Sequence, residues 1–164
     1  MKRIIGIDPG LIHTGWGIID SAGNERQYVA SGVILPPKNA PLPARLAYIY
    51  AELGALVRQW RPQEASIEIT FVNQNPTTTL LLGHARAAAI LALATEKVSI
   101  FEYEPNKIKK AITGAGHAGK DQIGMMIRVL LPNANPKTAD EADALAIALA
   151  HSNYSRVFPT DKSA

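Results

Sequence analysis

The stretch RIIGIDPGLIHTGWGIID, residues 3–20, holds two apolar segments joined through a Pro-Gly turn. The first segment, Arg3–Asp8, and the second, Thr14–Asp20, are rich in isoleucine, as β-strands are. Gln27–Leu35 follows the turn signal Ser-Ala-Gly-Asn at 21–24 and is a third candidate strand. Because the connections are short, these strands are predicted to pair as an antiparallel meander.

Helices and strands alternate over the rest of the chain. Apolar residues recur every three or four positions over Leu42–Trp60, which predicts a helix that ends before Pro62. Ala65–Thr70 is a short apolar strand, and Asn75-Pro76 supplies an N-cap and a first-turn proline for a helix that reaches Lys97. The remaining elements are predicted to be a strand at Val98–Tyr103 and helices at Pro105 to about Thr113, Lys120–Leu131 and Ala139 to about His151.

This order of elements determines the expected architecture. Three antiparallel strands, followed by helix, strand, helix, strand and helices, imply a five-stranded mixed α/β sheet with two parallel strands beside the first. It is the order of ribonuclease H-like folds. Residues 1–154 are predicted to form a single domain of this kind, with 155–164 as a disordered C-terminal tail. In such a sheet, sites gather at the carboxyl ends of the parallel strands.

Length and composition narrow the class of protein. The 164 residues suit one domain with a substantial core. The sequence has no cysteine, which excludes disulfides, zinc fingers and thiol catalysis and favours a reducing, cytoplasmic setting. Asp8 interrupts the apolar N-terminus, and the longest apolar run, Ala87–Ala94, is too short for a membrane span. A net charge of +3 and a pI near 9.2 favour a polyanionic partner.

Two carboxylates lie in the predicted strands. Asp8 ends an apolar strand, and the turn that follows leaves its side chain uncrowded at the strand tip. Glu68 lies between Ile67 and Ile69, which share the opposite face of their strand. If the two strands run parallel, Asp8 and Glu68 are neighbours at one edge. The alternatives are an aspartate that caps a turn and a surface glutamate on an edge strand.

Two more carboxylates share one face of the last helix. Thr138-Ala-Asp-Glu141 has the pattern of a capping box, which fixes the start of the helix and places Asp140 in its first turn. Asp143 follows three residues later on the same face. An acidic residue in a first turn also suits the helix dipole, which would explain Asp140 without a site. Asp143 lies too far into the helix for that explanation.

The four carboxylates come from three elements and have no cysteine or clustered histidine beside them. Such an all-oxygen set suits Mg²⁺, with Mn²⁺ as a substitute, rather than zinc or copper. Two divalent ions would balance four negative charges. In a two-metal site, one ion activates the attacking water and the other stabilises the leaving oxygen. The pattern therefore predicts metal-dependent hydrolysis of phosphodiesters.

Taken together, these segments resemble the RuvC family of Holliday junction resolvases, the crossover junction endodeoxyribonucleases, in one register over roughly residues 4–151. The matching motifs are Gly6–Gly10, Thr14–Gly17, Ile67-Glu68 with Phe71 three residues on, Leu82–Arg86, Lys109-Lys110, Lys120–Ile123 and Ala139–Leu145. The chain departs from the family pattern at Ile69, Gln74, His84 and Ala87.

The resemblance carries expectations about function. It implies that the catalytic, metal-binding carboxylates are Asp8, Glu68, Asp140 and Asp143. It implies a homodimer that resolves four-way DNA junctions by symmetric paired nicks, in recombination and DNA repair. It also implies a junction-binding, branch-migrating helicase complex as a partner.

Candidate DNA contacts cluster in one basic segment. Between residues 107 and 128, five lysine and arginine residues stand against one acid, Asp121. A lysine that neutralises a phosphate releases counterions and so contributes affinity, although a solvated helix face would have the same composition. The resemblance singles out two of these lysines as phosphate contacts, Lys109 and Lys120. Weaker candidates are Lys107, Lys110 and Arg86.

Phe71 follows the strand that carries Glu68. The resemblance suggests that its ring stacks on a base unpaired at the crossover, whereas burial in the core is the ordinary explanation for a phenylalanine. His13 and His117 lie in predicted loops, and no role is assigned to them.

Two other classes of protein share part of this pattern. Actin-like ATPases and sugar kinases also have a strand ending in Asp-x-Gly, but they use two related subdomains and a phosphate-binding motif that this chain lacks. A non-catalytic junction-binding protein of the same fold is the second alternative. The complete set of carboxylates argues against it.

Overall fold

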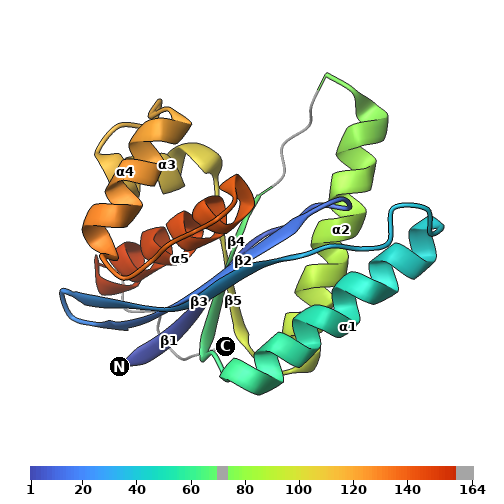
Figure 1. The fold of residues 1–164 in the computed structure, drawn as a ribbon, viewed down its shortest axis with the longest axis horizontal. Helices are drawn as coiled ribbons and strands as arrows, with labels where there is room; N and C mark the ends of the chain where they lie inside the picture. Colours follow the sequence, from blue (N-terminus) through green and yellow to red (C-terminus); the bar gives the residue numbers. More distant parts are fainter. Residues whose placement is uncertain (70–73, 158–164) are drawn as a thin grey trace.

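The structure is a computed structural model and describes residues 1–69 and 74–157. Within these residues the elements follow one another in the expected order (Figure 1). Their bounds are β1 (Lys2–Asp8), β2 (Thr14–Ala22), β3 (Glu25–Ile34), α1 (Leu42–Trp60), β4 (Glu64–Glu68), α2 (Pro76–Thr95), β5 (Ser99–Tyr103), α3 (Pro105–Thr113), α4 (Lys120–Leu130) and α5 (Ala139–Val157).

The strands form one five-stranded sheet in the order β3-β2-β1-β4-β5. The first three strands pair antiparallel, as their short connections require. β4 joins β1 in parallel, and β5 joins β4 in parallel, because a helix crosses back before each of them. The mixed sheet and the ribonuclease H-like topology expected from the sequence are confirmed.

The two faces of the sheet carry separate cores. In Figure 1, α1 and α2 lie on one face, and α5 lies on the other with α3 and α4 outside it. Side chains alternate along β1: Ile4 is buried with residues of α3, α4 and α5, whereas Ile5 and Ile7 are buried with residues of α1 and α2. By the same alternation, Asp8 belongs to the face that α5 covers.

Glycines let α5 lie unusually close to the sheet. A Cβ atom added to Gly6 would stand 2.1 Å from the carbonyl oxygen of Ala144, and one added to Gly15 would stand 2.2 Å from that of Asp140. Carbon and oxygen atoms cannot approach so closely, so only glycine fits at these two positions while the helix stays where it is. The N-terminal turns of α5 thus rest directly on β1 and β2.

Polar contacts hold the far end of α5. The imidazole of His151 lies 2.7 Å from a carboxylate oxygen of Glu64 on β4 and 2.7 Å from the hydroxyl of Tyr103 on β5. Lys2 donates to the other oxygen of Glu64 at 2.7 Å. Burial lowers the pKa of His151 despite its acidic neighbour. The helix is therefore fixed at a second point, away from its acidic first turns.

The sequence placed most boundaries correctly, and the differences have local causes. The helix expected to reach Lys97 ends at Thr95, because Lys97 adopts a left-handed conformation with φ of 60°. The last helix was expected to end near His151 and instead continues to Val157. Asn153, in the added turns, donates to the carbonyl oxygen of Ala111 at 3.0 Å. This contact with α3 is tertiary, so the sequence pattern gave no sign of it.

Candidate active site

The carboxylates at the two strand ends lie side by side. β1 and β4 are parallel, with Ile7 opposite Ile67, so Asp8 and Glu68 follow at the next position of the register. Both side chains are partly buried. β4 lies between β1 and β5. The alternative of a surface glutamate on an edge strand is therefore wrong, and the predicted pairing of the two strands is confirmed.

The first turns of α5 bring the other two carboxylates over this edge. The helix begins at Ala139, and the hydroxyl of Thr138 accepts the backbone N–H of Glu141 at 3.2 Å, which is one half of the expected capping box. The other half differs: the Glu141 carboxylate is buried and accepts hydroxyl hydrogen bonds from Ser31 at 2.8 Å and from Thr138 at 3.3 Å. Glu141 thereby ties the start of α5 to β3.

The loop after β1 is held by hydrogen bonds from Thr14 and Arg45. The buried hydroxyl of Thr14 donates to the carbonyl oxygen of Gly10 at 2.7 Å and accepts its N–H at 3.2 Å. The guanidinium of Arg45 on α1 donates to the carbonyl oxygen of Leu11 at 2.5 Å. His13 lies 3.5 Å from the carboxylate of Asp140. These contacts fix the turn that presents Asp8.

The pKa values indicate that the carboxylates repel one another. Burial, Asp143, Glu68 and Asp140 together raise the pKa of Asp8 to about 7. Burial also raises the pKa of Glu68 and of Asp143, with Asp143 acting on Glu68 and Asp140 acting on Asp143. Mutual repulsion at low solvent exposure is an arrangement that a bound cation would relieve.

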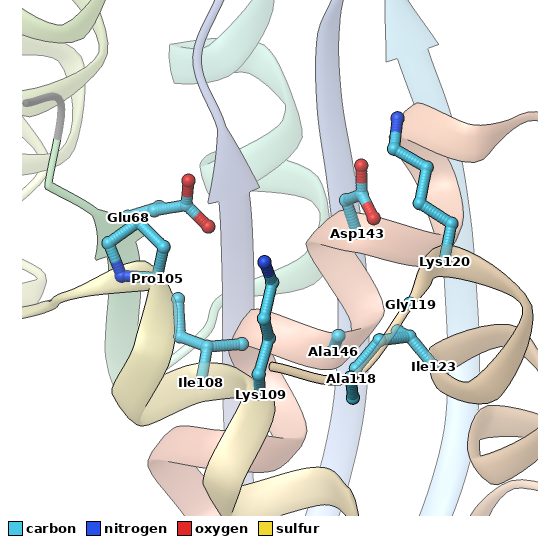
Figure 2. Close-up of a pocket in the computed structure, with 10 residues that line it drawn as sticks. All are labelled: Glu68, Pro105, Ile108, Lys109, Ala118, Gly119, Lys120, Ile123, Asp143 and Ala146. Atoms are coloured by element: carbon cyan, nitrogen blue, oxygen red, sulfur yellow. The ribbon is translucent and has the colours of Figure 1, made fainter. Parts of the chain in front are cut away.

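Two positively charged lysines lie near the carboxylates and partly offset their repulsion. A cavity of about 360 Å³ has Glu68 and Asp143 at its rim, together with Lys109 from α3 and Lys120 from the start of α4. Figure 2 shows both ammonium groups reaching toward the same side of the cavity as the two carboxylates. Lys109 lowers the pKa of Glu68, and Lys120 lowers that of Asp8. The cavity combines acidic and basic groups in the way that a phosphodiester with metal counterions requires.

Comparison with known proteins agrees with this geometry. Residues 4–151 match the family described as crossover junction endodeoxyribonuclease RuvC. The chain is 52% identical over 154 residues to the crossover junction endodeoxyribonuclease RuvC of Azorhizobium caulinodans, covering 94% of this chain and 91% of that protein. It is 51% identical over 152 residues to that of Bradyrhizobium diazoefficiens, covering 93% and 87%. The chain belongs to the RuvC family.

A solved RuvC structure supports the same assignment. T. thermophilus RuvC, in complex with Holliday junction substrate, matches this chain with a TM-score of 0.90 and 30% identity over 96% of both chains. The four carboxylates of this RuvC-family chain thus sit within a fold shared almost from end to end.

Nucleases of the RuvC family are metal-dependent, and the residues at this site fit a metal in their chemistry. All the candidate donors are carboxylate oxygens, and burial, together with the neighbouring carboxylates, raises the pKa of Asp8, Glu68 and Asp143. Among residues 1–69 and 74–157, no three histidine, aspartate or glutamate side chains stand in an arrangement ready to hold an ion.

The other candidate DNA contacts that the structure describes do not line the cavity beside the carboxylates. Lys107 and Lys110 are exposed on α3 and do not line the cavity in Figure 2. Arg86 forms an ion pair with Glu102 of β5, which occupies one of its guanidinium nitrogens. Phe71 lies outside the residues that the structure describes, so both its stacking role and its core role stay predictions.

Proposed function

We propose that this chain is a structure-selective, metal-dependent endonuclease that resolves four-way DNA junctions by symmetric paired nicks. Its place is in recombination and DNA repair, in the cytoplasm of a bacterial cell. The observation that carries the proposal is the meeting of four carboxylates from β1, β4 and α5 beside two lysines. The family membership and the junction bound by T. thermophilus RuvC support the choice of substrate.

In this proposal the metal-binding, catalytic residues are Asp8, Glu68, Asp140 and Asp143. The metal is Mg²⁺, with Mn²⁺ as a substitute, and two ions serve each subunit. When bound, such ions activate water and stabilise the leaving oxygen of a phosphodiester. The chain's own part is to hold Asp8 and Glu68 at the adjoining carboxyl ends of β1 and β4, and to hold Asp140 and Asp143 on the first turns of α5, which packs closely on the sheet. Lys109 and Lys120 attract the phosphates on either side of the scissile bond.

The first test is whether the purified protein cuts a synthetic four-way junction when Mg²⁺ is added. We expect cutting of the junction and little cutting of a linear duplex that contains the same sequences. A protein that binds the junction and cuts nothing with Mg²⁺ or Mn²⁺ would instead be a non-catalytic junction-binding protein.

The lysines are expected to contact phosphates. Lys109→Ala and Lys120→Ala should each slow cutting by roughly tenfold or more. In a plot of the logarithm of the junction-binding constant against the logarithm of the salt concentration, each should also make the slope less steep by about 0.9, the value of one phosphate contact. Lys110→Ala is the matched control, because it removes the same charge from the same helix as Lys109 but lies outside the cavity. If Lys109→Ala and Lys110→Ala behaved alike, the cavity would have no special role in phosphate binding.

The same proposal requires a homodimer, because a four-way junction presents two equivalent strands and each chain has one set of carboxylates. Helix α2 offers a surface for a second copy. Its inner face, with Ala85, Ala89 and Leu93, is buried in the core. The opposite face is an uncharged stripe, in which Leu80 is 66% and Leu91 is 59% exposed; its members are Leu80, Gly83, His84, Ala87, Leu91 and Ala94.

Exposed apolar stripes of this kind favour helix–helix association. α2 is also long and apolar enough to cross a membrane by length and composition alone. Burial of one face in the core and pairing of the other with a second copy would account for that composition without a membrane.

Leu91→Glu is expected to convert the dimer into a monomer, because it would bury two unpaired charges in the interface. Light scattering measures the mass, and the cutting assay should show single nicks in place of paired ones. Met125→Glu, at an exposed residue of α4, is the control and should leave the dimer intact. A Leu91→Glu protein that stays dimeric would show that the dimer interface does not include this stripe of α2.

The helicase complex implied by the resemblance stays a prediction of the sequence.

A further inference from the structure

A second cavity also borders the carboxylates. It has a volume of about 510 Å³ and is bounded by the loop after β1, the start of α2, Arg45 of α1 and the first turn of α5. Asp8 and Asp140 form part of its wall, whereas Glu68 and Asp143 border the cavity of Figure 2. Each cavity is therefore lined by two of the four carboxylates, so both cavities adjoin the same carboxylate cluster.

The two cavities differ in chemistry. The first cavity has two lysines whose charges reach the carboxylates. The second cavity has four aliphatic side chains, Leu11, Ile12, Leu81 and Leu82, and one arginine but no lysine; its other polar groups are His13, Thr78 and the carboxylates of Asp8 and Asp140. One arginine beside two carboxylates does not suit a phosphate, which requires several cations or N–H donors, whereas the four aliphatic side chains offer a surface to a flat organic ring.

Two features of the second cavity show that the chain's own residues leave part of its lining uncovered. Ile12 is 58% exposed and Leu81 is 38% exposed, although both are large apolar side chains. The Nε atom of Arg45 is buried and has no hydrogen-bond partner among the described residues, while its Nη2 atom holds the carbonyl oxygen of Leu11. Exposed apolar groups and an unsatisfied buried donor are both unfavourable unless a ligand covers them.

The position of the cavity restricts what that ligand is. His13, which lines it, lies 3.5 Å from the carboxylate of Asp140, so the cavity begins at contact distance from the catalytic centre. The base of a nucleotide next to the scissile phosphate lies close enough to the carboxylates to reach this cavity. Thr78 and Leu81 of α2 line the cavity, whereas Leu80 and Leu91 of the exposed stripe do not. A second copy bound at that stripe would leave the cavity open to DNA.

We propose that the second cavity is a base-binding subsite, which receives the base of a nucleotide next to the scissile phosphate and sets the preference for cleavage sequence. This inference rests on the proposed function. Bases at a crossover are partly unstacked, so one of them can enter a pocket at low cost, as in enzymes that take a base out of the helix. The aliphatic wall contacts the face or methyl group of the base, and Thr78, His13 and Arg45 are the polar groups available to its edge.

The test uses Ile12→Ala and Leu81→Ala, which shorten exposed side chains of the lining and should leave the fold intact by thermal melting. The substrates are synthetic four-way junctions that differ only in the base pairs next to the cutting position. For each protein we take the ratio between the fastest and slowest cutting rates with Mg²⁺. Val129→Ala is the matched control, because Val129 is 64% exposed on α4 and lines neither cavity.

We expect a clear preference in the wild-type protein, a ratio at least about fivefold smaller in both lining variants, and an unchanged ratio in the control, since a base contact is worth about 1–3 kcal/mol. Junction binding without metal should change by less than about twofold, because phosphate contacts dominate affinity. Unchanged ratios in both variants would overturn the subsite while leaving the proposed function in place. If the wild-type protein cut every junction at the same rate, that result would also overturn the subsite and leave the proposed function in place. A wild-type protein that cuts none of the junctions would overturn the proposed function and the subsite with it.

Discussion

Asp8→Asn will lower the rate of junction cutting by at least about 1,000-fold, or about 4 kcal/mol in barrier height, and will still make the metal-free protein more stable. The loss of activity follows from the removal of a candidate metal ligand at the centre of the carboxylate cluster. The gain in stability follows from electrostatics. The pKa of Asp8 is raised to about 7 by burial and by three other carboxylates, so its ionised form is unfavourable in the folded protein.

The sign of the pH dependence follows from this raised pKa. Folding penalises the ionised carboxylate of Asp8, so the penalty is absent below the unfolded value of 3.8, grows as the pH rises from there to about 7, and is constant at higher pH. Asparagine carries no charge and avoids the penalty. The stability gain of Asp8→Asn should therefore be small near pH 4 and largest at pH 8, where it is at most about 4 kcal/mol at about 1.4 kcal/mol for each pKa unit.

Urea unfolding in the presence of a chelator at pH 4, 6 and 8 measures this gain. Asp121→Asn is the matched control, since it makes the same chemical change at an exposed residue of α4. Mg²⁺ should stabilise the wild-type protein and have little effect on Asp8→Asn, because a ligand stabilises only the state that binds it. A destabilised Asp8→Asn protein at pH 8 would mean that Asp8 has a structural role in place of a metal-binding one.

Gly15→Ala is expected to reduce cutting by about 100-fold and to destabilise the protein by about 1–3 kcal/mol. The added Cβ atom would stand 2.2 Å from the carbonyl oxygen of Asp140, so the first turn of α5 must move by about 1 Å to relieve the clash. That movement carries Asp140 and Asp143 away from Asp8 and Glu68. Mg²⁺ should consequently stabilise the variant less than it stabilises the wild-type protein.

Gly124→Ala provides the matched control for this substitution. Gly124 lies on α4, and the nearest atom to an added Cβ is the flexible end of Arg128 at 3.9 Å. Alanine should be neutral or slightly stabilising there, because it favours helix more than glycine does. Full activity of Gly15→Ala would show that close packing of α5 on the sheet is not needed to assemble the site.

Local patterns in the sequence predicted the main features of the fold and the candidate site. The strand that ends at Asp8 and the helix that starts at Ala139 are both marked by neighbouring residues, namely the Pro-Gly turn and the Thr138 cap. The parallel pairing that puts Glu68 beside Asp8 follows from the order of the elements. These features depend on short-range chemistry and on the few ways of connecting strands.

Contacts between distant parts of the chain could not be predicted in this way. Glu141 has the right position for a capping box, but its carboxylate is taken by Ser31, 110 residues away. Arg86 was a candidate DNA contact, and its ion pair with Glu102 depends on how α2 packs on β5. Arg45 gave no local signal, although it holds the loop beside Asp8. Each of these depends on packing that no single motif encodes.

The most direct test of the account is to map the nicks that the wild-type protein makes in a four-way junction. Each of the four strands is labelled at its end in turn, and the products formed with Mg²⁺ are separated under denaturing conditions. We predict cuts in two opposite strands at symmetric positions, which a ligase can close, and no cuts without a divalent metal. Cuts spread over all four strands, or equal cutting of a linear duplex of the same sequence, would contradict the account.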